Sequence, residues 1–144
     1  MINKRMADNY LSDAKSILVE AKAARRRKHH HRAIRLSQES FELSLKAILR
    51  SIGVEYPKEH EVSDAVGENA AKFPDWFQSR VTYLEDASVW LSERRGPSMC
   101  GDEIAGKPAS QLFTSEDSRK ALEYADKALR FAKKLLSEIF RARS

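Results

Sequence analysis

A broad apolar face between residues 30 and 52 restricts the fold of this chain more than any other feature. Its members recur at helical spacing, with Ile34, Phe41, Leu45, Ile48 and Ile52 on the face and Leu36, Leu43 and Ala47 beside it. Spacings of three, four and seven residues are those of an α-helix with one buried side. Gly53 then supplies a left-handed C-cap, and Pro57 blocks continuation. We expect this helix to lie at the centre of the core.

The same periodicity predicts the rest of the architecture. Long helices are expected over 6–28, 75–93 and from residue 114 onward, with a short one over 60–72. Thr114 and Asp117 resemble a capping box at the start of the last helix. We therefore predict an all-α fold, an antiparallel up-and-down bundle of four long helices plus a short one, as a single domain over 1–144.

Composition excludes several classes of protein. Charged residues make up 33% and hydrophobic residues 42% of 144, which is typical of a globular chain. No apolar run approaches the roughly 18 residues of a membrane span, and the polar start is no secretory signal. The lone Cys100 excludes an internal disulfide. We expect a cytoplasmic protein without a membrane association, a metal or a cofactor.

Basic residues are concentrated in two stretches. Seven lie between Lys22 and Arg35 with no acid, and six lie between Lys127 and Arg143 with one acid. Arg25, Arg26 and Arg27 belong to the first stretch. They are candidates for phosphate contacts. The alternative is that they only complement the helix dipole in water.

The stretch 94–113 lacks helical periodicity and is the best candidate site. Its candidate ligand-binding residues are Arg94, Arg95, Ser98, Asp102, Glu103 and Lys107. Paired arginines can hold an anion, and glycines let the backbone approach a ligand. The alternative is a surface loop whose charges pair with one another. His60, at a predicted helix start, is a candidate general base or simply a capping side chain.

Several motifs together resemble the HEPN family of prokaryotic helical bundles over nearly the whole chain. They are the run from Gln38 to Leu49, the turn at His60, and the stretch from Gly101 to Asp117. The resemblance implies about five helices, a homodimer, and nucleotide or RNA binding. It also implies a small nucleotidyltransferase as partner in a toxin–antitoxin system.

Ribonuclease members of that family carry an arginine followed, after four to six residues, by a histidine. Here Arg95 is followed by Cys100, which argues against catalysis. We interpret the pairs Arg25–His30 and Arg26–His31 as chance matches in a basic tract.

The favoured hypothesis is a HEPN-type module that binds nucleotide, RNA or a protein partner, without catalytic activity of its own. One alternative is a metal-independent endoribonuclease that uses Arg95 and His60. Another is a dimeric adaptor whose aromatic face (Trp76, Tyr83, Trp90) docks a larger complex.

Overall fold

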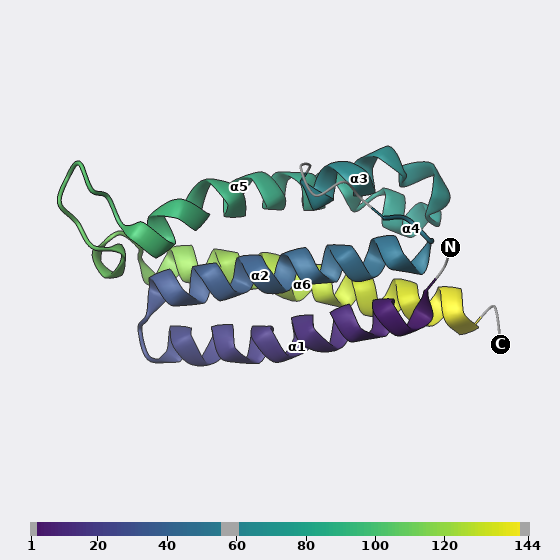
Figure 1. Ribbon diagram of the computed structural model, residues 1–144, viewed down its shortest axis with the longest axis horizontal. Coiled ribbons are helices and arrows are strands. Elements are labelled where there is room, and N and C mark those ends of the chain that lie inside the picture. Colours follow the sequence, from purple (N-terminus) through teal and green to yellow (C-terminus); the bar gives the residue numbers. More distant parts are fainter. Residues whose placement is uncertain (1–2, 56–60, 142–144) are drawn as a thin grey trace.

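The computed structural model describes residues 3–55 and 61–141, and all the named elements in this part of the chain are helices (Figure 1). The long ones are α1 (Lys4–Arg26), α2 (His30–Ser51), α5 (Val81–Cys100) and α6 (Ser115–Arg141), and the short ones are α3 (Val62–Glu68) and α4 (Asp75–Gln78). Single 3₁₀ turns occur at Ala70–Lys72 and Ala109–Gln111. The prediction of an all-α chain is confirmed.

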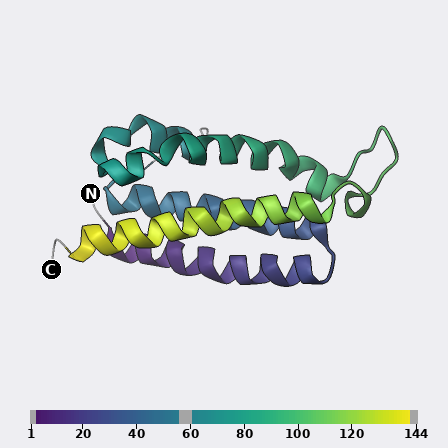
Figure 2. The ribbon, with the colours of Figure 1, turned by 180° about the vertical axis from the view of Figure 1, so that it is seen from behind.

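The four long helices alternate in direction along the chain (Figures 1 and 2). Helix α2 packs against α1, α5 and α6, and α6 also contacts α1 and α5. The main cluster of buried apolar side chains draws on all six α-helices. The central position predicted for the helix after residue 30 is therefore observed.

Small side chains allow α1, α2 and α6 to approach one another closely. Their buried faces carry mainly alanine and serine, including Ala7, Ala14, Ala21 and Ala24 on α1, Ala33, Ser37, Ser40 and Ser44 on α2, and Ala121, Ala125, Ala128 and Ala132 on α6. The Ser40 hydroxyl donates to the carbonyl oxygen of Ala14 over 2.7 Å, which links α2 directly to α1. Short side chains at facing positions reduce the distance between helix axes.

Large aromatic rings fill the space between α5 and α6. The ring centroid of Tyr83 lies 5.5 Å from that of Tyr124, and Trp90 lies 5.7 Å from the same ring. Trp76, on α4, lies 6.5 Å from Phe131. The aromatic face that the adaptor hypothesis assigns to a partner is thus occupied by α6 of the same chain. An adaptor would need another surface.

The helix predicted over 75–93 is in fact two helices, with a break at Ser79 and Arg80. The Ser79 hydroxyl donates to the carbonyl oxygen of Trp76 over 2.8 Å. Serine hydroxyls compete in this way with the helical backbone pattern. The Arg80 amide instead donates to the carbonyl oxygen of Phe77 over 2.8 Å, which closes a tight turn before α5.

Helix α5 continues to Cys100, so the prediction that the helix ends at Glu93 is wrong. Pro97 lies inside it, and a proline there removes one helical hydrogen bond and crowds a preceding carbonyl. The Ser98 side chain is buried and its hydroxyl donates to the carbonyl oxygen of Arg95 over 2.8 Å, which supplies a bond beside the proline. Consequently the two candidate arginines of the predicted loop lie on a helix.

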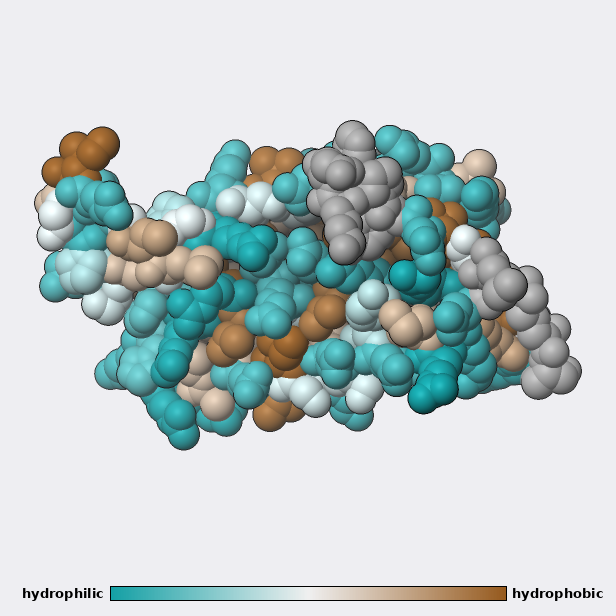
Figure 3. Space-filling view, in the orientation of Figure 1, coloured by the Kyte–Doolittle hydropathy of each residue, from teal (hydrophilic) through white to brown (hydrophobic). Residues whose placement is uncertain are grey.

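A short loop, residues 101–107, projects from the end of the bundle after α5 (Figure 1). Asp102 and Lys107 exchange two backbone hydrogen bonds of 2.8 and 2.9 Å across it. Gly101 has a φ of 74°, and a Cβ atom there would lie 2.4 Å from the Lys107 carbonyl oxygen, so only glycine fits. Ile104 is fully exposed, and the space-filling view shows a hydrophobic tip on this loop (Figure 3).

Candidate functional site

A groove follows the outer side of α2, first beside α1 and then beside α5. Two hollows of about 320 and 370 Å³ form it, and they share Arg35. The first is lined by Glu20, Ala23, Ala24, Arg27, His29, Arg32, Arg35 and Leu36, and the second by Arg35, Gln38, Glu39, Glu42, Leu43, Lys46, Arg95 and Met99. We call this surface the α2 groove.

Four arginines line the α2 groove: Arg27 at the C-cap of α1, Arg32 and Arg35 on α2, and Arg95 on α5. Within residues 3–55 and 61–141, none of these guanidinium groups makes a hydrogen bond, an ion pair or a ring contact. A free guanidinium presents five N–H donors in a fork that matches phosphate oxygens. These four side chains are therefore available to an anionic ligand.

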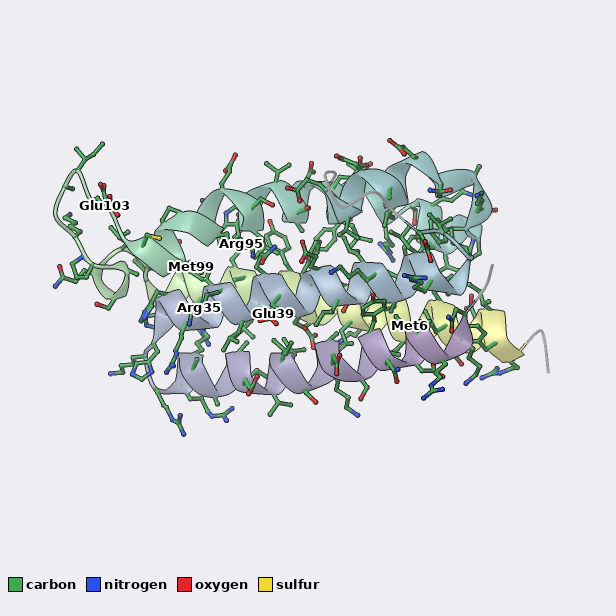
Figure 4. All side chains as sticks on the ribbon, in the orientation of Figure 1. Met6, Arg35, Glu39, Arg95, Met99 and Glu103 are labelled. Atoms are coloured by element: carbon green, nitrogen blue, oxygen red, sulfur yellow. The ribbon has the colours of Figure 1, made fainter. Side chains whose placement is uncertain are left out.

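The groove also has an apolar component. Leu36, Leu43 and Met99 line it, and the Met99 residue is 56% exposed. Figure 4 shows Met99 and Arg95 on α5 above Arg35 and Glu39 on α2. An exposed apolar side chain beside free arginines offers contacts to a ligand that combines phosphates with flat apolar rings.

Arg94 and Arg95 do not act as a pair. The Arg94 guanidinium carbon lies 3.8 Å from the centroid of the Trp90 ring, and its Nη1 donates to the Trp90 carbonyl oxygen over 2.9 Å. Arg95, the next residue, lines the α2 groove instead. Successive side chains of a helix point about 100° apart. Because this segment is helical, which the sequence did not predict, the side chains of Arg94 and Arg95 point in different directions. The prediction that both bind one anion loses its geometric basis.

The other candidates of that stretch also lie outside the groove. Ser98 is buried, and its hydroxyl is bonded to the backbone. Asp102, Glu103 and Lys107 lie on the projecting loop, and the Asp102 carboxylate accepts a hydrogen bond from the Ala105 amide over 3.0 Å. Figure 4 shows Glu103 on this loop, away from Arg35 and Glu39. His60 lies outside the described residues.

A separate hollow of about 510 Å³ lies where the α1–α2 turn meets the start of α6. It is lined by Lys22, Arg25, Arg26, Lys28, His30, Ser115 and Leu122, and we call it the corner cavity. The predicted residues Arg25 and Arg26 thus belong to this cavity, whereas Arg27 belongs to the α2 groove.

Arg25 and His30 meet at one hydroxyl in the corner cavity. Arg25 Nε donates to Ser118 Oγ over 3.1 Å, and His30 Nδ1 lies 2.9 Å from the same oxygen. Arg25 Nη2 also donates to Ser115 Oγ over 3.1 Å. The arginine and histidine that the sequence analysis treats as a chance match are therefore spatial neighbours.

Several residues that line the α2 groove and the corner cavity were not predicted from the sequence. For Arg35, Glu39 and Glu42 a signal existed, because their spacing of three and four residues places charged groups along one exposed side of α2. For the corner cavity no local signal existed. Ser115 and Arg25 are separated by 90 positions in the chain and meet only through the packing of α1 against α6.

Positive charge at the α1–α2 turn affects the titration of a nearby histidine. Partial burial and the neighbouring Arg35 lower the pKa of His31 below its ordinary value of 6.5. His29, Arg32 and His30 act in the same direction. His31 is therefore mainly neutral at pH 7.

No group of three or more His, Cys, Asp or Glu side chains in the described part of the chain is arranged to hold a metal ion. Among the helices of residues 3–55 and 61–141, none has both the length and the apolar character that crossing a bilayer requires.

The family profile described as HEPN domain matches residues 7–135, which is nearly the whole chain. No curated protein and no solved structure has a significant match.

Proposed function

Because this chain belongs to the HEPN family, a family generally related to nucleotides and RNA, we propose that it binds single-stranded RNA in the α2 groove. The supporting observation is the set of four arginines that line this groove without a partner in the described residues. None of these four arginines pairs with an acid of the groove in the described residues, so they remain available to RNA phosphates, whose binding releases counterions.

The layout of the groove favours a single strand over a duplex. Arg27 and Arg32 line the first hollow, and Arg95 lines the second beside Met99 and Leu43. Phosphates of a single strand would bind the guanidinium groups while unstacked bases contact the apolar side chains. Glu39 and Glu42 also line the second hollow and disfavour phosphates beside them, so phosphates are expected there only at Arg35 and Arg95, with bases over the rest of that end.

We propose a binding role without catalysis. A histidine separated from Arg95 by four to six residues would supply a general base, but Cys100 holds the position that follows four intervening residues. The alternative, an endoribonuclease, is supported by the proximity of Arg25 and His30 at Ser118. It predicts RNA cleavage that depends on these two side chains.

The homodimer and the nucleotidyltransferase partner rest on the family alone. We propose both as part of the same function, a toxin–antitoxin-like pair in which this chain supplies RNA binding. Light scattering after size-exclusion chromatography, performed on the chain alone and mixed with a nucleotidyltransferase encoded beside it, measures both associations. A monomer that binds no such enzyme would contradict this part of the proposal.

The experiment for RNA binding is a fluorescence anisotropy titration of labelled single-stranded RNA in chelator. Arg95→Ala and Arg35→Ala should each weaken binding about tenfold, as expected for loss of one charge-assisted contact. Lys133→Ala is the matched control, since Lys133 is an exposed cation on α6 away from the groove. Equal affinities for all four proteins would refute the groove.

The same samples then separate binding from catalysis. RNA recovered after the titration is run on a denaturing gel beside RNA incubated with Arg25→Ala and His30→Ala. Intact RNA throughout supports a binding module. Shortened RNA with the native chain, and intact RNA with both variants, would replace it with the ribonuclease alternative.

A further inference from the structure

The corner cavity is a second basic hollow that the α2 groove does not include. Helical residues are spaced at about 100°, so Lys22, Arg25 and Arg26 point to the opposite side of α1 from Ala24 and Arg27. A ligand in the corner cavity would therefore not compete with RNA in the groove.

The lining of the corner cavity contains five basic residues and no acid. The nearest acids in the sequence of α6 are used elsewhere. Asp117 accepts a hydrogen bond from the Thr114 amide over 2.9 Å as part of the helix cap, and Glu116 accepts from Arg119 over 2.9 Å. Lys22 lies 4.0 Å from an Asp126 oxygen on α6, whereas the side chains of Arg26 and Lys28 have no ion pair within the described residues. Without an anionic occupant, these two unpaired cations repel each other.

One of these cations is fixed in place before any ligand arrives. Two nitrogens of Arg25 are held by Ser115 and Ser118, and His30 contacts the same Ser118 hydroxyl. These contacts leave the Nη1 donors of Arg25 free, since a guanidinium has five N–H groups. A side chain held by hydroxyls keeps its full charge and loses little entropy on binding an anion.

Lys28 is the most informative residue of the cavity, because its backbone has a left-handed conformation with a φ of 63°. The same turn ends α2, where Gly53 has a φ of 76°. In both turns the amide of the left-handed residue donates to the carbonyl oxygen three residues earlier: Lys28 N to Arg25 O (2.9 Å) and Gly53 N to Arg50 O (3.1 Å). The amide of the following residue donates to the carbonyl oxygen five residues before itself: His29 N to Ala24 O (2.9 Å) and Val54 N to Leu49 O (3.0 Å).

Glycine is the favoured residue at this position of a helix end, and a side chain with a Cβ costs free energy there. The chain has glycine at one of the two turns and lysine at the turn that borders the corner cavity. Local strain kept at one of two equivalent turns indicates that the side chain itself is needed. The Lys28 side chain has no hydrogen bond, ion pair or ring contact within the described residues.

We propose that the corner cavity binds a chain of linked phosphates, with Lys28 and Arg26 closing over a site whose wall is Arg25. Three formal charges, from Arg25, Arg26 and Lys28, approach that of a triphosphate, and Lys22, which is shared with Asp126, lies beside them. A hollow of about 510 Å³ is larger than a single phosphate needs. The chain of phosphates can belong to a free polyphosphate, a nucleoside triphosphate or the 5′ end of an RNA.

The test is calorimetric titration with sodium tripolyphosphate, paired with thermal unfolding. Lys28→Gly should weaken tripolyphosphate about tenfold, the loss of one charge-assisted contact, and raise the unfolding midpoint by about 3 °C because the left-handed strain is relieved. Lys28→Asn, which is neutral and tolerates this conformation, should weaken binding equally. Lys133→Ala is the control and should bind as the native chain does.

Three results would overturn the proposal: no tripolyphosphate binding by the native chain, unchanged binding by Lys28→Gly, or equal affinity for tripolyphosphate and orthophosphate. ATP and a pair of RNAs that differ only in a 5′-triphosphate or 5′-hydroxyl identify the source of the phosphates. The 5′-hydroxyl RNA also separates this proposal from the RNA groove. Affinity for the 5′-hydroxyl RNA should be lowered by Arg95→Ala and unaffected by Lys28→Gly. Affinity for tripolyphosphate should be lowered by Lys28→Gly and unaffected by Arg95→Ala.

Discussion

The outer face of α6 and the corner between α1 and α2 are both rich in cations, but these cations have different contacts. On α6, Lys120, Lys127 and Lys134 lie over aromatic rings, 5.2 Å from Trp90, 5.1 Å from Tyr83 and 4.2 Å from Trp76. Arg130 Nε also lies 2.8 Å from an Asp126 oxygen. These cations stabilise the chain they belong to.

The turn between α1 and α2, which includes cations of both the corner cavity and the α2 groove, has few such contacts. Within the described residues, Arg26, Arg27, Lys28, Arg32 and Arg35 make no hydrogen bond, ion pair or ring contact through their side chains. The two regions thus teach that a count of basic residues does not measure the charge available to a ligand. What matters is whether acids or aromatic rings are placed within reach of each cation.

The largest expected difference between the two regions concerns RNA affinity. Replacing Arg27, Arg32 and Arg35 together by alanine should weaken single-stranded RNA more than about tenfold and reduce the slope of log affinity against log salt by about 2. Replacing Lys120, Lys127 and Lys134 instead should leave RNA affinity within about twofold and lower the unfolding midpoint. Anisotropy titrations at several salt concentrations measure both. Equal losses of affinity would break the comparison.

Removing the Trp90 ring should leave cations near α6 without an aromatic partner, like the unpaired cations at the turn between α1 and α2. Trp90→Ala deletes the ring beneath Arg94 and Lys120 and the contact with Tyr124. We expect a free energy of unfolding lower by about 2–4 kcal/mol, from urea denaturation, because a half-buried ring is lost. The released cations should add weak, salt-sensitive RNA binding. If neither quantity changes, the rings do not neutralise this face.

The two regions should also lose stability in different pH ranges. Burial and Arg35 lower the pKa of His31, so the unfolded chain binds its proton first. The free energy of unfolding should therefore fall as the pH drops below about 6.5 and level off below the lowered pKa. Hydrogen bonds from Arg119 lower the pKa of Glu116 and Glu123 below 4.5, so their contribution is full above that pH and lost only below it.

Urea denaturation of the native chain and His31→Gln at pH 7.5, 6.0 and 5.0 measures the first range. The native chain should lose more stability than the variant between pH 7.5 and 5.0. A parallel dependence in both proteins would remove His31 as the cause.

The smallest effect is expected at Tyr83, the ring of α5 beneath Lys127. Its hydroxyl is buried without a hydrogen-bond partner in the described residues, and burial, together with Glu123, raises its pKa to about 12. Tyr83→Phe removes an unsatisfied polar group and keeps the ring under Lys127. Stability in urea should rise by up to about 1 kcal/mol. A clear loss would show that the hydroxyl has a partner.

Much of the fold follows from local patterns in the sequence. Gly53 ends α2 as predicted, and Thr114 and Asp117 form the predicted reciprocal cap of α6, with bonds of 2.9 and 3.2 Å. The errors occur where local rules are overridden. Pro97 normally breaks a helix, yet the buried Ser98 and the packing of α5 keep the helix intact to Cys100.

The sites were less predictable because they depend on which helices pack together. The count of bases from residue 127 onward missed Glu123 and Asp126, which lie just before that window and pair with Lys127 and Arg130. The corner cavity joins residues of α1 and α6, and no spacing in the sequence reports that contact. Arg27 and Arg95 were both predicted as candidates, but they line one groove only because the helices α1 and α5 both pack against α2.

The exposed thiol of Cys100, the only cysteine in the chain, has a practical consequence. It follows Met99, which lines the α2 groove, so a single maleimide dye can be attached one residue from the groove without mutagenesis. Its emission would report occupancy of the groove. The same thiol can link two copies in air, so measuring the oligomeric state with and without reductant separates a disulfide-linked dimer from a native assembly.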